Sequence, residues 1–195
     1  MNTPTNWPVL AQAHEALLTA VRGVAPADWD RPTPCSEWNA AQVLQHAAGD
    51  QLGYAGFLGE GTGPAEDPFT PSGKLGDEPL AVAETAVSAA AEAWSRVPAD
   101  QAEVPVPLPP NKMPASLGAN ACALDAAVHA WDIAVATGQA SPLTAEFAAE
   151  LLGAARQFVE PLRAFAFAPV VPAQPGDDAA AELLKYLGRR PDWTA

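Results

Sequence analysis

The sequence predicts an all-α protein, an antiparallel four-helix bundle with additional short helices at the C-terminus. Alanine is abundant and β-branched residues are few, which favours packed helices over sheets. The 21 prolines gather between the alanine-rich stretches, where they end helices. Within the stretches, apolar residues recur three and four positions apart, so each stretch has one face for packing.

The first part of the chain contains two predicted helices. One spans about residues 8–25, and a proline suits its first position. The next begins after Ser36 or Asn39, either of which can cap it, and reaches about residue 59. Residues 60–78 form a Gly/Pro/acidic connection that is longer than ordinary loops, which indicates a functional or mobile segment.

The remaining helices are also bounded by proline, glycine or capping residues. They are expected at about 79–97, at about 116–137 before Gly138, at about 142–164 after a Ser141 cap, and at about 178–188. No internal repeat is visible, so the chain is expected to be a single domain, 1–195. Its core bundle is placed at about 8–164 and a C-terminal appendage at about 165–195.

Composition excludes several classes of partner. Ten basic and 23 acidic residues give a net charge of −13, which repels phosphate backbones and anionic lipid, so neither nucleic acid nor membrane is expected. Two cysteines make no disulfide framework in a chain of this size. The first residues carry no leader signature, and no apolar run reaches the length of a membrane span. A cytoplasmic location is therefore expected.

The predicted helix at 116–137 carries a candidate metal motif. Asp125 and His129 are four positions apart, so they lie one above the other on one face. A carboxylate and an imidazole in this relation can bind one ion, given a third ligand from a neighbouring helix. His46, beside the core-directed residues of the second helix, is that candidate. Three protein ligands leave positions open, as in catalytic metal sites.

Simpler interpretations of the same residues stay open. A buried histidine is often a hydrogen-bonded core residue, and an Asp/His pair one turn apart can be a contact on the helix surface. Asp132 can accept a hydrogen bond from a ligand imidazole, or it can pair with an arginine on another helix.

Other residues near the motif receive weaker assignments. Asp50 is a possible fourth ligand or proton acceptor, although a polar residue at the bundle end is the more ordinary reading. Cys35 is expected to be a buried packing thiol rather than a nucleophile, since nothing basic is close in sequence. Trp38 is expected in the core, with a place at the mouth of a site as the alternative. His14 lies away from the apolar series of the first helix and is expected to face solvent.

Three segments carry a family resemblance: "TPCSEWNAAQVLQHAAG", "LDAAVHAWDIAVATG" and the tail "LLKYLGRRPDW". Together they resemble the DinB-like superfamily of metal-binding four-helix bundles, in the actinobacterial branch related to mycothiol-dependent maleylpyruvate isomerase. The resemblance implies a divalent metal on His46, Asp125 and His129. The isomerase carries a glutamate where this chain has Asp125, and the shorter side chain shifts the metal, so isomerase chemistry does not follow from the resemblance alone.

The expected function is a metal-dependent enzyme of this mycothiol-dependent class. Zinc is preferred for mixed nitrogen and oxygen ligands, with nickel or manganese as alternatives. The resemblance implies a low-molecular-weight thiol such as mycothiol as co-substrate and a small-molecule electrophile, in S-transfer, conjugation or thiol-assisted isomerisation. A non-catalytic protein that binds metal or sequesters a small ligand is the alternative. Monomer and homodimer both stay open.

Overall fold

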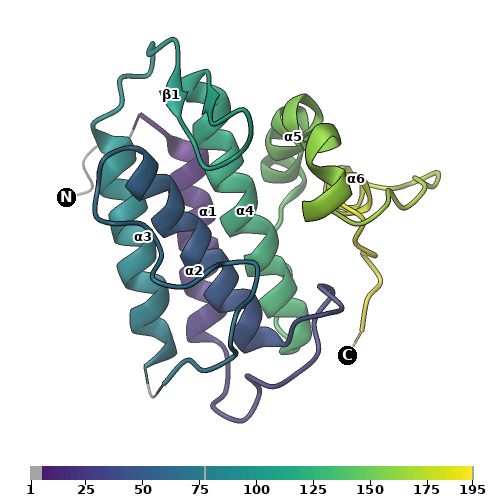
Figure 1. Ribbon diagram of the computed structural model, residues 1–195. Helices are drawn as coiled ribbons and strands as arrows, with labels where there is room; N and C mark the ends of the chain where they lie inside the picture. Colours follow the sequence, from purple (N-terminus) through teal and green to yellow (C-terminus); the bar gives the residue numbers. More distant parts are fainter. Residues whose placement is uncertain (1–5, 77, 195) are drawn as a thin grey trace.

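The computed structural model describes residues 6–76 and 78–194, and their regular secondary structure is almost entirely helical (Figure 1). Residues 1–5, on which part of the leader argument rests, and residue 195 lie outside the described part. The helices are α1 Pro8–Arg22, α2 Ala40–Phe57, α3 Pro79–Ser95, α4 Ala115–Ala136, α5 Ala145–Ala166 and α6 Ala179–Tyr186. Between α3 and α4, two short strands, β1 Val104–Pro105 and β2 Lys112–Met113, pair antiparallel. The all-α prediction is confirmed.

The first four helices form the bundle, in which α1 and α2 each pack against both α3 and α4. Helices α1 and α4 end together, where Gln139 donates a hydrogen bond to the carbonyl of Ala20. Helices α2 and α3 end together at the other end, where Arg96 forms an ion pair with Glu60. The neighbours α1/α3 and α2/α4 are therefore antiparallel, while α1/α4 and α2/α3 are parallel. The long connection after α2 causes this, because it returns along the bundle before α3 begins (Figure 1).

Several helices begin at other residues, or have other capping residues, than the sequence predicted. Asn39, not Ser36, caps α2: its side chain accepts from the backbone N–H of Gln42, whose own side chain accepts from the N–H of Asn39. Thr144, rather than Ser141, caps α5, which moves its start three residues later than expected. Gly138 follows α4 with a φ of 75°, a conformation that glycine adopts without strain.

Helix α4 is buried on almost every side, because the bundle covers one flank and α5 packs on another (Figure 1). The apolar series Leu124, Val128 and Trp131 is buried as expected, and the polar residues between them lie in the interior too. Helix α6 packs on α5. The division into a core at 8–164 and an appendage at 165–195 stays a prediction.

The expectation for His14 is wrong. Its side chain is buried, at 5% exposure, and its Nε2 lies 2.8 Å from Oε1 of Gln51 on α2. The polar partner on another helix is what lets an imidazole leave solvent. Among the described residues, no helix has both the length and the apolar content needed to cross a bilayer.

Candidate metal centre

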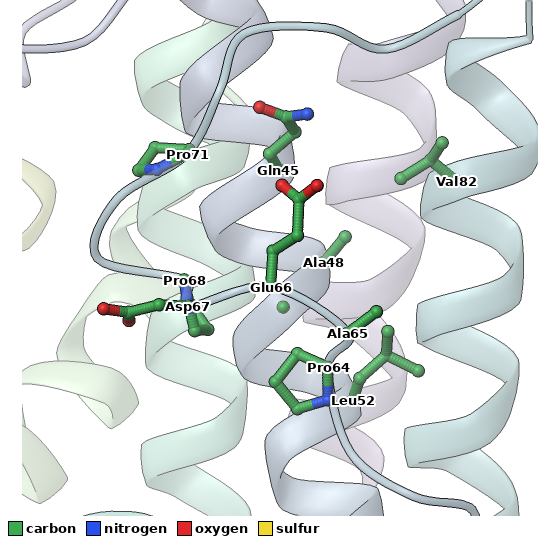
Figure 2. Close-up of a pocket in the computed structure, with 11 residues that line it drawn as sticks. Gln45, Ala48, Leu52, Pro64, Ala65, Glu66, Asp67, Pro68, Pro71 and Val82 are labelled. Atoms are coloured by element: carbon green, nitrogen blue, oxygen red, sulfur yellow. The ribbon is translucent and has the colours of Figure 1, made fainter.

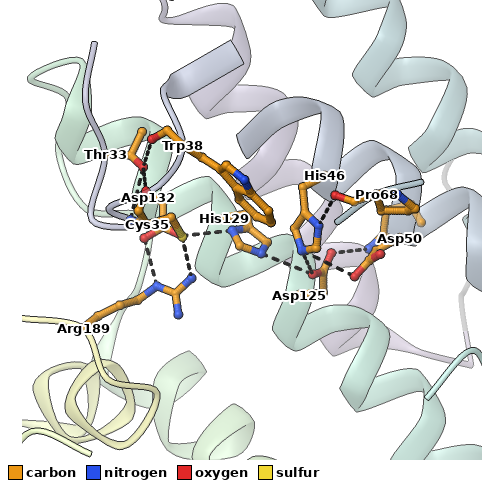
Figure 3. Close-up of polar contacts among 11 residues, drawn as sticks. Thr33, Cys35, Trp38, His46, Asp50, Pro68, Asp125, His129, Asp132 and Arg189 are labelled. Atoms are coloured by element: carbon orange, nitrogen blue, oxygen red, sulfur yellow. Dashed lines mark hydrogen bonds and ion pairs between the residues drawn. The ribbon is translucent and has the colours of Figure 1, made fainter. Parts of the chain in front are cut away.

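Three predicted residues meet between α2 and α4: His46 from α2, and Asp125 and His129 from α4 (Figure 3). Each offers a ligand atom, and these atoms all lie within 4.8 Å of one another. The Nε2 atom of His129 is 3.4 Å from Oδ1 of Asp125, and the Nε2 atom of His46 is 3.9 Å from the same oxygen. Two segments about eighty residues apart therefore place three ligand-type atoms around one point.

The orientation of His46 is set by the connection between α2 and α3. Its Nδ1 lies 2.9 Å from the carbonyl oxygen of Pro68 (Figure 3). A carbonyl oxygen only accepts hydrogen bonds, so Nδ1 carries the hydrogen and donates it. The other ring nitrogen, Nε2, is left with its lone pair directed toward Asp125.

The orientation of His129 is set by Asp132, one turn further along α4. The Nδ1–H of His129 donates to Oδ2 of Asp132 over 2.9 Å, which leaves Nε2 as the free acceptor. Arg189, in the segment after α6, donates from Nε and Nη2 to the two oxygens of Asp132, at 2.9 and 2.7 Å. The sequence offered a hydrogen bond from a ligand imidazole and a pair with an arginine as alternatives for Asp132, and its carboxylate makes both contacts. The pattern links the C-terminal segment to the metal candidate through two buried side chains.

Electrostatics explain how the buried carboxylate of Asp132 stays ionised. Burial raises its pKa, but the Arg189 guanidinium and the hydrogen bond from His129 outweigh burial and hold the pKa well below its usual range. Burial lowers the pKa of His129 to about 4, against the opposing hydrogen bond to Asp132, so this imidazole is neutral at pH 7.

Asp125 is oriented by a glutamine from α2. Nε2 of Gln51 donates to Oδ2 of Asp125 over 3.3 Å and to the carbonyl of Cys122 over 3.2 Å, while its Oε1 contacts His14. The second oxygen of Asp125, Oδ1, faces the two imidazoles. Burial raises the pKa of Asp125, and the neighbouring Asp50 carboxylate raises it further. The sequence gives no sign of this role for Gln51, because an uncharged amide on a helix has no distinctive pattern.

The three facing atoms fit a divalent cation. Two imidazole lone pairs and a carboxylate oxygen are all acceptors, and acceptors that face one another in a buried place need a hydrogen or a cation between them. Neutral imidazole and carboxylate are common ligands of zinc and of neighbouring transition metals. The second oxygen of the carboxylate and the second nitrogen of each imidazole all have partners, as is usual around metal ligands.

The surroundings of the cluster combine aromatic and acidic side chains. The Trp38 ring lies 4.6 Å from the His46 ring, centroid to centroid, and Phe69 meets the same imidazole edge-on at 5.4 Å. Asp50, one turn after His46, has Oδ2 3.6 Å from its Nε2. The side chains of His46, His129 and Asp125 are 8, 9 and 14% exposed, so the cluster is nearly enclosed. Trp38 is half-buried here, beside the site.

A second group, Cys35 with His129 and Asp132, also has ligand-type atoms within 4.8 Å of one another. Arg189 already fills this place, because its Nη2 lies 3.2 Å from the Cys35 sulfur and bonds Asp132. A cation there would face a buried guanidinium. Burial, together with the Asp132 carboxylate, raises the pKa of the Cys35 thiol, which fits a packing role. A basic residue does lie close in space, although none is close in sequence.

Comparison with known proteins identifies the family of the chain. The sequence pattern of the mycothiol maleylpyruvate isomerase N-terminal domain matches residues 10–134, which include all three candidate ligands. Uncharacterized proteins from two strains of Mycobacterium tuberculosis, CDC 1551 / Oshkosh and H37Rv, are each 32% identical over 187 residues, covering 91% of this chain and 94% of theirs. No solved structure matches the chain at a significant level. The chain belongs to the mycothiol maleylpyruvate isomerase N-terminal domain family.

Proposed function

We propose that the chain is a metal-dependent enzyme in which His46, Asp125 and His129 hold a divalent cation and a low-molecular-weight thiol reacts with a small electrophile. The observation that carries the proposal is the convergence of three acceptor atoms whose imidazoles Pro68 and Asp132 already orient. Family membership supports mycothiol as the thiol. Zinc is the preferred ion for this ligand set, with nickel and manganese as alternatives.

The chemistry of the site divides between the ion and the chain. A bound divalent cation lowers the pKa of a coordinating thiol, so that a thiolate nucleophile is present at neutral pH. The Nε2 atoms of His46 and His129 would supply lone pairs to the ion, and the carboxylate of Asp125 would supply a negative charge. Asp50 lies beside the cluster as a carboxylate that can take the thiol proton or act as a fourth ligand.

The reaction class follows from the thiol rather than from a visible substrate site. A thiolate at this position can transfer sulfur, form a conjugate, or add reversibly to a double bond and so assist its isomerisation. Asp125 is one methylene shorter than the glutamate that the resemblance gives the isomerase, so a cation held here would lie closer to α4. Isomerisation would require the displaced ion to hold the isomerase substrate in a different geometry. Conjugation and S-transfer carry no such requirement, because neither depends on the geometry of that particular substrate.

A non-catalytic function is the second candidate, and the enclosure of the cluster favours it. Side-chain exposures of 8 to 14% leave a narrow approach to the ligand atoms. A narrow approach is sufficient for a protein that binds an ion, or that sequesters a small ligand beside Trp38 and Phe69. Tight ligand retention without turnover across a panel of thiols would favour this reading.

The proposal is tested by metal analysis followed by turnover. Protein purified without a metal-affinity tag should contain about one divalent ion per chain by mass spectrometry, and should consume mycothiol with members of an electrophile panel. His129→Ala should lose the ion because one of three ligands is gone, while its helical circular dichroism persists because Leu124, Val128 and Trp131 still pack.

The outcomes separate the candidates. Unchanged metal content in His129→Ala contradicts the ligand assignment. Metal binding that depends on His129, without turnover of any thiol, contradicts the enzyme and supports the binding protein.

A further inference from the structure

A glycine in α2 lies directly under the loop residue that orients His46. Gly49 has ordinary helical backbone, so its conformation does not require glycine, and glycine lowers helix stability relative to alanine. A Cβ at this position would lie 2.8 Å from Cγ and 3.0 Å from Cβ of Pro68. Close approach of Pro68 is therefore the physical reason for glycine at this position.

Pro68 makes two contacts with α2 at once. Its ring packs on Gly49, and its carbonyl accepts the hydrogen bond from Nδ1 of His46, three residues earlier on the helix. Figure 2 shows Pro68 and the residues before it running along α2. These residues line a cavity of about 130 Å³. The distance between the ring and the helix thus sets the distance between the carbonyl and the imidazole.

Two hydrogen bonds anchor the loop to α2 just after Pro68, on the part of the helix that precedes His46. The side chain of Gln42 donates to the carbonyl of Pro71 over 3.1 Å, and Gln45 accepts from the backbone N–H of Gly73 over 2.6 Å. These bonds bring the loop onto the helix, and the missing side chain at Gly49 lets it approach closely enough for Pro68 to reach His46.

We infer that Gly49 is a positioning residue of the metal site, which acts on His46 through Pro68. The inference rests on the proposed function, since it assigns the Nε2 atom of His46 to a metal ion. Gly49 itself contacts no ligand atom; its role is to admit the carbonyl that keeps the hydrogen on Nδ1 and the lone pair on Nε2.

The size of the effect follows from the distances between Pro68 and a Cβ at position 49. Ordinary contact begins at about 3.4 Å, so Gly49→Ala has to push Pro68 away by about 0.6 Å. The proline ring is part of the backbone and cannot swing aside as a flexible side chain can. A shift of this size takes the 2.9 Å bond to His46 toward the limit of hydrogen bonding. Loss of a partner that orients a ligand lowers metal affinity by about 10- to 100-fold.

The experiment compares two alanine substitutions one turn apart on α2. Gly49→Ala should raise the Kd for the metal ion at least about tenfold, measured by competition with a chromophoric chelator. Gly53→Ala is the matched control, because the nearest atoms to a Cβ there belong to Pro107 at 3.9 Å, an ordinary contact. The control should change affinity less than about twofold, since it makes the same gain in helix propensity without the clash.

A second pair of variants tests the route through Pro68. With Pro68→Gly, the atom nearest to an alanine Cβ at position 49 becomes the backbone Cα, now at 3.6 Å. Adding Gly49→Ala to this background should therefore change affinity little, which is the coupling that a double-mutant cycle measures. A purely structural defect in α2 would lower affinity equally in both backgrounds.

The tautomer of His46 gives a readout that needs no metal. In chelator-treated protein, nitrogen NMR should find the hydrogen on Nδ1 in the wild type and in Gly53→Ala, and should find it redistributed in Gly49→Ala. Equal affinities of Gly49→Ala and Gly53→Ala, or an unchanged tautomer in Gly49→Ala, would overturn the inference. Failure of the wild type to bind any divalent ion would instead refute the proposed function, and the tautomer measurement would still decide whether Gly49 orients His46.

Discussion

Replacing Arg189 tests whether the C-terminal segment supports the metal site. Asp132 is fully buried, and its carboxylate receives two hydrogen bonds from Arg189 and one from His129. Arg189→Met keeps an unbranched, flexible apolar side chain but removes the guanidinium with its charge and its hydrogen-bond donors. It leaves a buried carboxylate that still accepts hydrogen bonds from the His129 N–H and from the Cys35 thiol but has lost its positively charged partner.

The magnitude follows from the burial of both partners. Removing one member of a buried ion pair costs about 3–5 kcal/mol, and the surviving bond from His129 places Arg189→Met near the lower end, at about 3 kcal/mol. For a chain of this length that corresponds to a fall in Tm of about 6–12 °C. The measurement is urea and thermal unfolding with chelator present, so that bound metal adds nothing to the native state.

The neighbouring arginine supplies the control. Arg190 pairs with Asp192, and both side chains are mostly exposed, at 71 and 74%. Arg190→Met should leave the unfolding midpoint unchanged, because exposed ion pairs contribute little. Equal stabilities of the two variants would refute the reasoning, since the buried pair would then contribute no more than an exposed one.

A double substitution separates stability from metal binding. Arg189→Met with Asp132→Leu replaces the whole buried pair by apolar groups, which should recover most of the lost stability. Metal affinity should not recover, because His129 has lost the acceptor for its Nδ1–H. Recovery of both would show that Asp132 does not orient the ligand.

Two further predictions concern Asp125 and His14. Asp125→Glu should retain more metal affinity than Asp125→Ala, since a carboxylate remains, and equal losses in isothermal titration would argue against ligation. Burial lowers the pKa of His14 to about 4 from an ordinary 6.5, so its contribution to stability is present above pH 6.5 and is lost as the pH falls toward 4. Between pH 7 and pH 5 the wild type should lose about 2 kcal/mol more than His14→Gln in urea unfolding, and parallel pH profiles would contradict the burial of a neutral imidazole.

There is a physical reason why the sequence could predict that these helical residues lie together. Asp125, His129 and Asp132 stand in a helix with almost no other charged residue, so the helix is interior and its polar residues need partners. Spacing alone placed two of them on one face. The bundle then made His46 the natural third member, because apolar residues on either side of it direct that part of α2 inward.

The parts that escaped prediction depend on contacts between distant segments. His14 was expected in solvent because its partner, Gln51, belongs to a different helix and carries no signal of its own. Arg189 stands 57 positions from Asp132, so its pairing leaves no local pattern. The contact of His46 with Pro68 uses a backbone carbonyl, which every residue has. Only the unusual length of the connection pointed there.

The residues that orient the two imidazoles lie in different parts of the chain with respect to the stretch that matches the family pattern. Pro68 lies within the stretch that matches the family pattern, residues 10–134, together with all three candidate ligands. Arg189 lies outside it, and the match to the mycobacterial relatives covers most of the remaining chain. A bundle of this family that ends before an equivalent of Arg189 would leave the buried carboxylate of Asp132 without its cation. Such a protein must supply another positive charge there or lose the acidic residue, because a buried carboxylate needs a partner. The C-terminal segment therefore belongs to the support of the candidate site, since Arg189 holds the acceptor of His129, although the segment contributes no candidate ligand.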